Sequence, residues 1–107
     1  MREIMTDTPK FFVCRLLAPR PTFLQDITAE ERALMGAHAG YWREAMARGM
    51  VVIFGPVADP AGPWGLGVLR VADAQAVKDF AASDPVVKAG IGFRYEILPM
   101  VSAVLPG

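Results

Sequence analysis

The sequence predicts a single small α+β domain made of four strands and two main helices. Three observations support this prediction. The chain has 107 residues, enough for one hydrophobic core but not for two, because domains usually span roughly 100 to 150 residues. Four short apolar runs with the character of strands alternate with two segments of helical periodicity. Hydrophobic residues make up 53% of the chain, a high share for a small domain, so we expect some apolar surface to meet another subunit.

Charge and cysteine content exclude several classes of protein. Eleven Lys and Arg residues balance eleven Asp and Glu residues, so no net positive field exists to hold a nucleic acid or an anionic membrane. Cys14 is the only cysteine, which excludes an internal disulfide and fits a reducing compartment. Residues 1–10 lack the apolar stretch of a signal peptide or a membrane span. We therefore expect a cytoplasmic protein with an N-terminal arm, 1–10, and no nucleic-acid or membrane partner.

The first strand is predicted from Phe11 to Leu17, a branched and aromatic run that ends before Pro19. The capping sequence from Thr28 to Glu31 then begins a long helix. This helix is expected to run to about Arg48, with Gly49 as its stop. Helical spacing assigns to its apolar face Leu34, Ala37, His38, Tyr41, Ala45 and Met46, and to its solvent face Glu31, Arg32, Arg43 and Glu44.

A hairpin and a second helix follow. Met50 to Phe54 is a continuous apolar run that predicts the second strand. The proline-rich stretch from Asp59 to Pro63 predicts a turn, after which Trp64 to Val71 resumes a strand pattern. Asp73 stands at the N-cap position of a helix over Ala74 to Ala82.

The last part of the chain completes the sheet. Asp84-Pro85 is expected to start a short extra turn, because a side-chain acceptor before a proline favours the first helical position, and Gly90 ends it. Ile91 to Val101 predicts the fourth strand and leaves a tail, 102–107. The order β-α-β-β-α-β is the ferredoxin-like pattern, an antiparallel sheet with helices on one face, here as one domain over residues 1–107. Since all four strands are apolar on both sides, we expect a second copy to bury the uncovered face in a homodimer, a dimeric α+β barrel.

The only histidine, His38, is the first candidate functional residue. Tyr41 and Trp42 follow three and four residues later, so the three side chains project from neighbouring parts of the helix and partly desolvate the imidazole. An imidazole in this setting suits acid-base chemistry, and the structural alternative is a core-edge histidine held by one hydrogen bond. Asp84 likewise has two interpretations, as a catalytic carboxylate or as a helix cap ahead of Pro85.

Three short motifs make the sequence resemble the YciI-like (YCII-related) family. They are a histidine in the first long helix, a Gly-Pro after the second strand and an Asp-Pro followed by Ala-Gly before the last strand. They stand here as His38 with Tyr41-Trp42, Gly55-Pro56 followed by Asp59, and Asp84-Pro85 followed by Ala89-Gly90. The resemblance covers about Phe11 to Val101 and implies a dimeric α+β barrel with a His-Asp active site at His38 and Asp84. An insertion relative to shorter members, Pro19 to Ile27, is expected over the pocket mouth.

The pair of His38 and Asp84 suggests a mechanism. Asp84 would accept a hydrogen bond from one ring nitrogen and stabilise the imidazolium, while the other nitrogen acts as general acid or base. The reaction would be proton abstraction, elimination or isomerisation on a small carbonyl or hydroxylated aromatic compound, and a few family members dechlorinate a chlorinated hydroxyquinol by loss of HCl. A nucleophile is disfavoured because Cys14 lies mid-strand and Ser83 lacks an elbow motif. A non-catalytic ligand-binding or regulatory dimer with the same pocket stays open as the alternative.

Substrate contacts are expected from residues near this pair. Arg15, an isolated charge in an apolar strand, could hold an anionic substrate group, and the alternative is a salt bridge to Glu96 or another strand carboxylate. The other candidates, of which the strand aromatics are equally good core residues, are Trp42, Gly55, Pro56, Trp64 and Phe93.

We expect neither a cofactor nor a metal. The glycine-rich stretch from Gly62 to Gly67 leads into a strand and not into a helix whose N-terminus could hold a phosphate. One histidine with scattered carboxylates is a poor ligand set for a metal ion.

Overall fold

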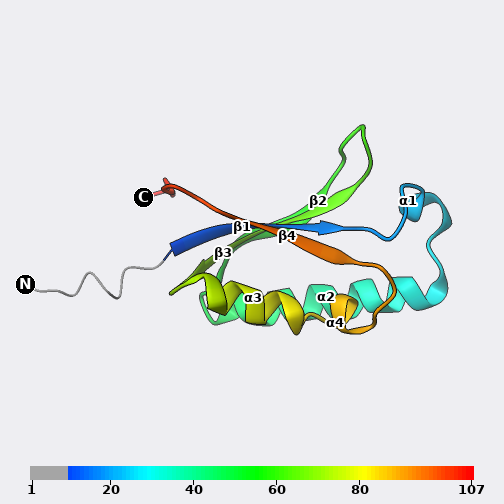
Figure 1. The fold of residues 1–107 in the computed structure, drawn as a ribbon, viewed down its shortest axis with the longest axis horizontal. Helices are drawn as coiled ribbons and strands as arrows, with labels where there is room; N and C mark the ends of the chain where they lie inside the picture. The colour runs from blue at the N-terminus through cyan, green and yellow to red at the C-terminus, as the bar shows by residue number, and fades with distance from the viewer. Residues whose placement is uncertain (1–9) are drawn as a thin grey trace, which may run out of the picture.

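The computed structural model describes residues 10–107, which form a four-stranded antiparallel sheet with helices packed on one face (Figure 1). The strands lie in the order β2-β3-β1-β4. The elements are β1 (Lys10–Leu17), α1 (Phe23–Asp26), α2 (Ala29–Ala47), β2 (Val51–Val57), β3 (Trp64–Val71), α3 (Ala74–Ala82), α4 (Pro85–Lys88) and β4 (Arg94–Pro99). The α+β prediction is confirmed, and the arrangement is compatible with a ferredoxin-like fold. Of the predicted N-terminal arm, residues 1–9 lie outside the described residues and Lys10 belongs to β1.

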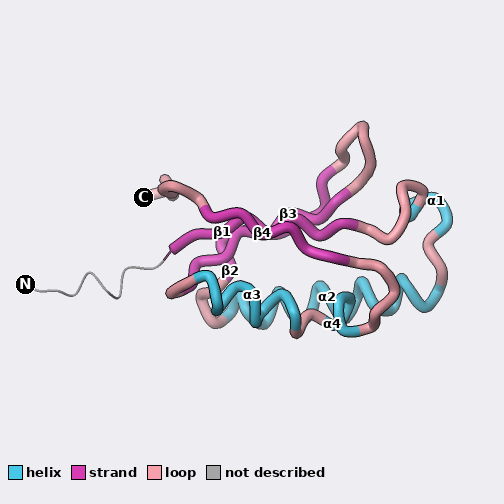
Figure 2. Tube along the Cα trace, viewed as in Figure 1, coloured by secondary structure: helices cyan, strands magenta, loops and turns pink. Residues whose placement is uncertain are grey.

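Alternation along the strands separates two faces of the sheet. Phe12, Cys14 and Leu16 of β1 are buried under the helices, while their neighbours in the strand point to the other face. Figure 2 shows α2, α3 and α4 together on one side of the sheet. The core between these two layers includes Phe12, Cys14, Trp42, Leu69, Val77 and Phe80.

Helix α2 begins as predicted but buries a different set of side chains. Thr28 Oγ1 accepts from the Glu31 amide at 3.0 Å, and Glu31 Oε1 accepts from the Thr28 amide at 2.9 Å, which confirms the capping box. Trp42 and Ala45 are buried, whereas Met46 is exposed. The prediction that Glu31 faces solvent is wrong, because Arg20 donates to both of its carboxylate oxygens and the side chain is buried. No helix in the described part of the chain, α2 included, is long and apolar enough to cross a membrane.

Strands β2 and β4 differ from their predicted bounds by more than one residue. β2 continues through Gly55 and Pro56 to Val57, which is possible because β2 lies at the sheet edge, where proline is tolerated. β4 begins at Arg94 and ends at Pro99, so it is shorter at both ends than predicted. At its start, Gly92 adopts a φ of 110° and takes the chain out of the extended conformation.

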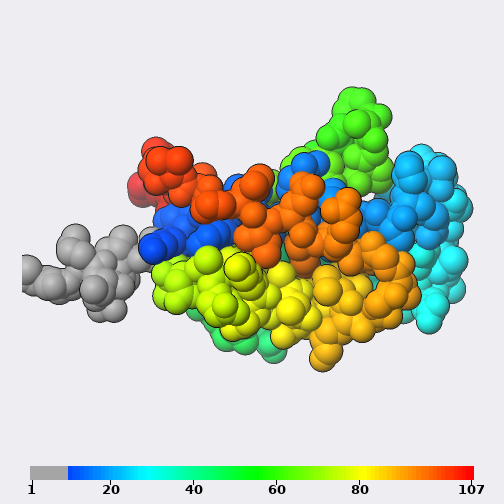
Figure 3. Space-filling view, viewed as in Figure 1, coloured from blue at the N-terminus to red at the C-terminus, as the bar shows by residue number. Residues whose placement is uncertain are grey.

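The insertion between β1 and α2 contains a helical turn, α1, that was not predicted. Phe23 of α1 packs edge-on against Phe93, with ring centroids 5.2 Å apart. Figure 3 shows this segment (blue) at the same end of the molecule as the projecting β2–β3 hairpin (green). Both segments therefore border the same end of the sheet.

Candidate functional site

A cavity of about 390 Å³ lies between α2 and the end of the sheet that carries the β2–β3 hairpin. Its size falls within the range of small-molecule sites, about 300–1,000 Å³. The walls are mostly apolar and include Phe23, Phe54, Trp64 and Phe93. Helix α1, within the insertion, contributes Phe23 and Leu24 to the lining of the cavity, and the place of the insertion over the pocket mouth stays a prediction.

A glycine allows α2 to approach the sheet at this cavity. The Trp42 indole lies over Gly67 of β3, and a Cβ atom at position 67 would fall 2.2 Å from Trp42 Cη2. Only glycine permits such an approach between a ring and a strand backbone. The Trp42 side chain is consequently buried, with its indole nitrogen directed at Asp84.

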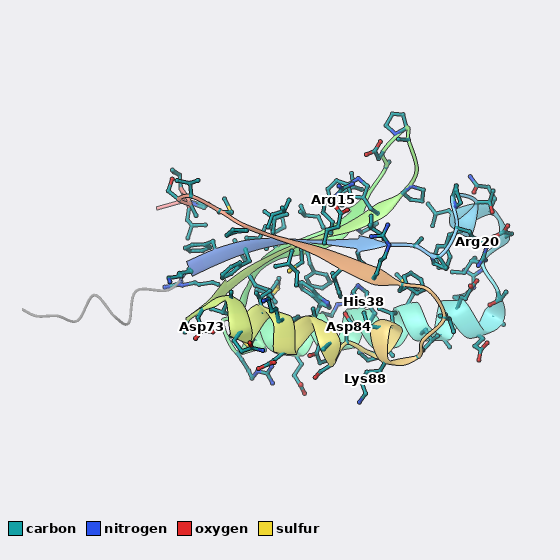
Figure 4. All side chains as sticks on the ribbon, viewed as in Figure 1. Arg15, Arg20, His38, Asp73, Asp84 and Lys88 are labelled. Carbon is teal, nitrogen blue, oxygen red and sulfur yellow. The ribbon has the colours of Figure 1, made fainter. Side chains whose placement is uncertain are left out.

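The Asp84 carboxylate is fully buried and has four hydrogen-bond partners. Its Oδ2 atom lies 2.8 Å from His38 Nδ1, and it accepts from Trp42 Nε1 at 2.9 Å and from the Tyr95 hydroxyl at 2.6 Å. Its Oδ1 atom accepts from the Val86 amide at 3.1 Å, which caps α4. Figure 4 shows His38 and Asp84 together in the layer between the sheet and the helices. Asp84 is therefore a helix cap and a partner of His38 at the same time.

The charge state of Asp84 determines which atoms of His38 and Tyr95 carry protons. Burial raises the pKa of Asp84, but the hydrogen bonds from His38 and Tyr95 outweigh it, and the pKa lies below its ordinary value. Asp84 is thus a carboxylate that can only accept hydrogen bonds. His38 Nδ1 must then carry the proton between them, and Nε2 of this cavity-lining ring has no hydrogen-bond partner among residues 10–107. Burial and the hydrogen bond to Asp84 raise the pKa of Tyr95, so its hydroxyl stays protonated.

Most of the predicted site residues come together at the cavity. Those that line it are His38, Trp42, Gly55, Pro56, Trp64 and Phe93. Asp84 lies behind His38 and does not line the cavity.

Arg15 is the exception among the predicted site residues. It points to the other face of the sheet (Figure 4), where its Nη1 donates to Glu96 Oε1 at 2.9 Å. Its guanidinium lies 4.4 Å from the centre of the Trp64 ring. The salt bridge to Glu96, the alternative for Arg15, is confirmed. The expectation that Arg15 reaches the pocket is corrected, because alternation along β1 directs its side chain away from the helices.

Two polar residues of the site were not predicted from the sequence. The Tyr95 hydroxyl donates to Asp84 and accepts from Trp42 Nε1 at 3.0 Å. The available signal was a phenol in an apolar strand, which needs a hydrogen-bond partner when buried. Arg43 was assigned to solvent, and it is exposed, yet it also lines the cavity. Arg43 follows Ala39, another lining residue, by four positions, and residues four apart are neighbours on a helix surface.

The other reactive groups of residues 10–107 do not line this cavity. Cys14 is buried in β1, and burial raises the pKa of its thiol to about 12, so it is an inert side chain. Within residues 10–107, no three His, Cys, Asp or Glu side chains gather closely enough to hold a metal ion. The chemistry that the described side chains offer at the cavity is proton transfer at His38 and charge pairing at Arg43.

Comparisons with known proteins agree with the fold. The family model described as the YCII-related domain matches residues 11–101. No curated protein matches the chain. Among solved structures, the NE2512 protein of unknown function from Nitrosomonas europaea superposes with a TM-score of 0.51 at 17% sequence identity. That match covers 94% of this chain and 98% of the other, and at such low identity it is evidence for the fold alone.

Proposed function

The chain belongs to the family of YCII-related domains, and from this premise we propose that it is a small-molecule enzyme in which His38 and Asp84 perform general acid-base chemistry. The observation that carries the proposal is the 2.8 Å contact between His38 Nδ1 and Asp84 Oδ2 at the wall of an apolar cavity. The proposed substrate is a small carbonyl or hydroxylated aromatic compound. The proposed reaction is proton abstraction followed by isomerisation or elimination.

In this mechanism, His38 Nε2 removes a proton from a substrate carbon or hydroxyl group, and the substrate becomes an enolate or phenolate. The Asp84 carboxylate stabilises the imidazolium that forms, and it stays ionised because its pKa is lowered. Return of the proton to a different carbon completes an isomerisation. Departure of a leaving group with its electron pair completes an elimination.

Trp42 and Tyr95 support the proposal as positioning residues. Each donates to the same carboxylate oxygen that contacts His38. Their hydrogen bonds hold Asp84 in place, and the apolar walls beside His38 keep the effective dielectric constant low. Both features strengthen the interaction between a carboxylate and a newly formed imidazolium.

The alternative is a non-catalytic small-ligand-binding or regulatory dimer that uses the same pocket. The observation that favours it is the capping of α4 by Asp84, since this structural role requires no reaction. In that case His38 would be a hydrogen-bond partner of a bound ligand and no turnover would occur.

We further propose that the protein is a homodimer in the cytoplasm, formed through the uncovered face of the sheet. The paired residues Ile53, Val68, Val13 and Leu98 form an apolar row across all four strands on that face. Ile53 and Leu98 are each 54% exposed. A second sheet packed against this row would bury it and give the dimeric α+β barrel.

The experiment compares His38→Asn and Asp84→Asn with the wild type over a panel of hydroxylated aromatics and small keto acids. Turnover and ligand affinity are measured separately for each variant. Asp73→Asn is the matched control, because Asp73 caps α3 through the Ala76 amide and asparagine is an equally good cap. Circular dichroism monitors folding, since Asp84→Asn disturbs three side-chain hydrogen bonds to a buried carboxylate.

Loss of turnover by at least about 100-fold in His38→Asn, with affinity retained, supports the enzyme. Loss of affinity alone, with no turnover in the wild type, supports the binding alternative. Wild-type turnover in a folded His38→Asn variant contradicts the acid-base role, whatever the outcome for Asp84→Asn.

A further inference from the structure

We propose that the cavity selects anionic substrates and that Arg43, which lines the same cavity as His38, binds their carboxylate or other acidic group. This inference rests on the function proposed for the cavity and names the substrate class that it would accept. It transfers to Arg43 the anchoring role that the sequence suggested for Arg15.

Five of the side chains that line the cavity can form hydrogen bonds. They are His38, Trp42, Arg43, Trp64 and Tyr95. The Trp42 indole is committed to Asp84 and Tyr95, and the Tyr95 hydroxyl donates to Asp84. The Trp64 indole donates to Asp59 Oδ2 at 2.9 Å. Among these side chains, only the Nε2 atom of His38 and the guanidinium of Arg43 remain available to a ligand.

Arg43 has no competing partner among residues 10–107. The adjacent Glu44 lies near Arg48 instead, at 3.5 Å. No Asp or Glu side chain of the described part of the chain lines the cavity, because Asp84 is enclosed behind His38. Among the described residues, an anion inside the cavity would therefore meet the guanidinium of Arg43 and no facing carboxylate. A guanidinium pairs with a carboxylate through two parallel hydrogen bonds, which a neutral ligand cannot match.

The spacing of the two groups limits the size of the substrate. His38 and Arg43 are five residues apart on α2, so their backbones are separated by about 7.5 Å along the helix axis and by about 140° around it, and both side chains line the cavity. A substrate with one aromatic ring, or a short carbon chain, between its acidic group and its reacting group has a length of this order and could contact both side chains. The cavity walls suit such a ring or carbon chain, because Phe23, Phe54 and Phe93 present apolar surface to it.

The test uses two probes that differ only in charge, 4-hydroxybenzoate and 4-hydroxybenzamide. Affinities are measured by isothermal titration calorimetry, and amide shifts of Gly65 and Gly67 in NMR spectra locate binding at the cavity. The wild type is expected to bind the benzoate roughly tenfold or more tightly than the benzamide. The preference should shrink as salt is added, because Arg43 is exposed.

Arg43→Gln is expected to reduce this preference to less than about twofold, while Arg43→Lys retains part of it. Arg32→Gln is the matched control, since Arg32 is an exposed arginine of α2 that does not line the cavity. Three results would overturn the inference: no binding of the benzoate at millimolar concentration, equal affinity of the wild type for both probes, or an unchanged preference in Arg43→Gln.

The variant His38→Asn separates this inference from the proposed function. It should keep the preference for the benzoate, because Arg43 is intact. If it also keeps wild-type turnover, the acid-base proposal fails while anion selection stands. If the preference is absent in the wild type but His38→Asn abolishes turnover, anion selection fails while the acid-base proposal stands.

Discussion

Gly67 and Trp42 are a pair in which the size of one residue determines the position of the other. The indole occupies the space in which any other residue at position 67 would place its Cβ atom. Because Gly67 has no side chain, the Trp42 ring can lie against β3, where its Nε1 atom donates a hydrogen bond to Asp84. A glycine in a strand signals such a close approach, but it does not reveal which side chain approaches.

Gly67→Ala is expected to destabilise the fold by about 1–3 kcal/mol, because the new methyl group would overlap the Trp42 ring and force α2 away from the sheet. Urea denaturation measures the change. The control is Gly36→Ala, where nothing lies within 4 Å of the added atom. In that exposed helical position alanine is expected to stabilise by up to about 1 kcal/mol. Equal stability of Gly67→Ala and the wild type would contradict the packing argument.

The candidate site was partly predictable from individual residues. His38 is the only histidine, and the Asp84-Pro85 pair has the form of a helix cap, so both stood out in the sequence. Their contact joins positions 46 residues apart and depends on the packing of α4 against α2. The role of Tyr95 could not be predicted because a strand pattern does not show which hydroxyl will be close to which carboxylate.

Segment 18–28 is attached to α2 by a cluster of charges. Arg20 donates to Glu31 at 2.7 Å through each of two nitrogens and to Asp26 at 2.7 Å through a third. The hydrogen bonds from Arg20 and from the Thr28 amide lower the pKa of Glu31 to about 2. This segment places Phe23 in the cavity wall. The ion pairs between Arg20 and Glu31, a residue of the α2 capping box, therefore help to hold that wall in position.

This pKa predicts an acid-dependent loss of stability. The pKa of Glu31 is lower in the folded state than its ordinary value of 4.5. Its contribution to the free energy of unfolding is therefore complete above pH 4.5 and is lost as the pH falls to about 2. Glu31→Gln should therefore be less stable than the wild type at neutral pH, and the difference should shrink across that interval. Thermal unfolding at a series of pH values measures it.

Glu30→Gln provides the matched control, because Glu30 is the exposed neighbour of Glu31 in the first turn of α2. Its difference from the wild type is expected to be small. A Glu31→Gln variant whose deficit is the same at pH 7 and pH 2 would argue against the charge cluster.

The sheet as a whole has one covered and one uncovered face, and the apolar row across the uncovered face is the basis for the proposed homodimer. If a second copy covers this row, a charge within it should prevent association. Ile53→Glu is therefore expected to convert a wild-type dimer into a monomer, as measured by light scattering after size exclusion. Met46→Glu, at an exposed apolar position on α2, should leave the dimer intact. A wild-type monomer at micromolar concentration would refute the homodimer.

Short-range patterns in the chain were sufficient for most of the fold. The bounds of β3 and α3 and the start of α2 agree with their predictions, because alternation and capping residues are encoded within a few neighbouring positions. The start of β4 was not encoded in this way. Ile91 and Phe93 are apolar residues that suit a strand, but the positive φ of Gly92 between them interrupts it.

The functional geometry depended on packing between distant segments. Both Arg15 and Arg43 were visible as charges near apolar residues, but their places relative to the cavity follow from which face of the sheet the helices cover. Likewise, the sequence identified His38 and Asp84 as candidates, and the folded chain brought their side chains into contact. Local sequence specifies the backbone conformation of each element, whereas the partners of a side chain are set by the free energy of packing the entire core.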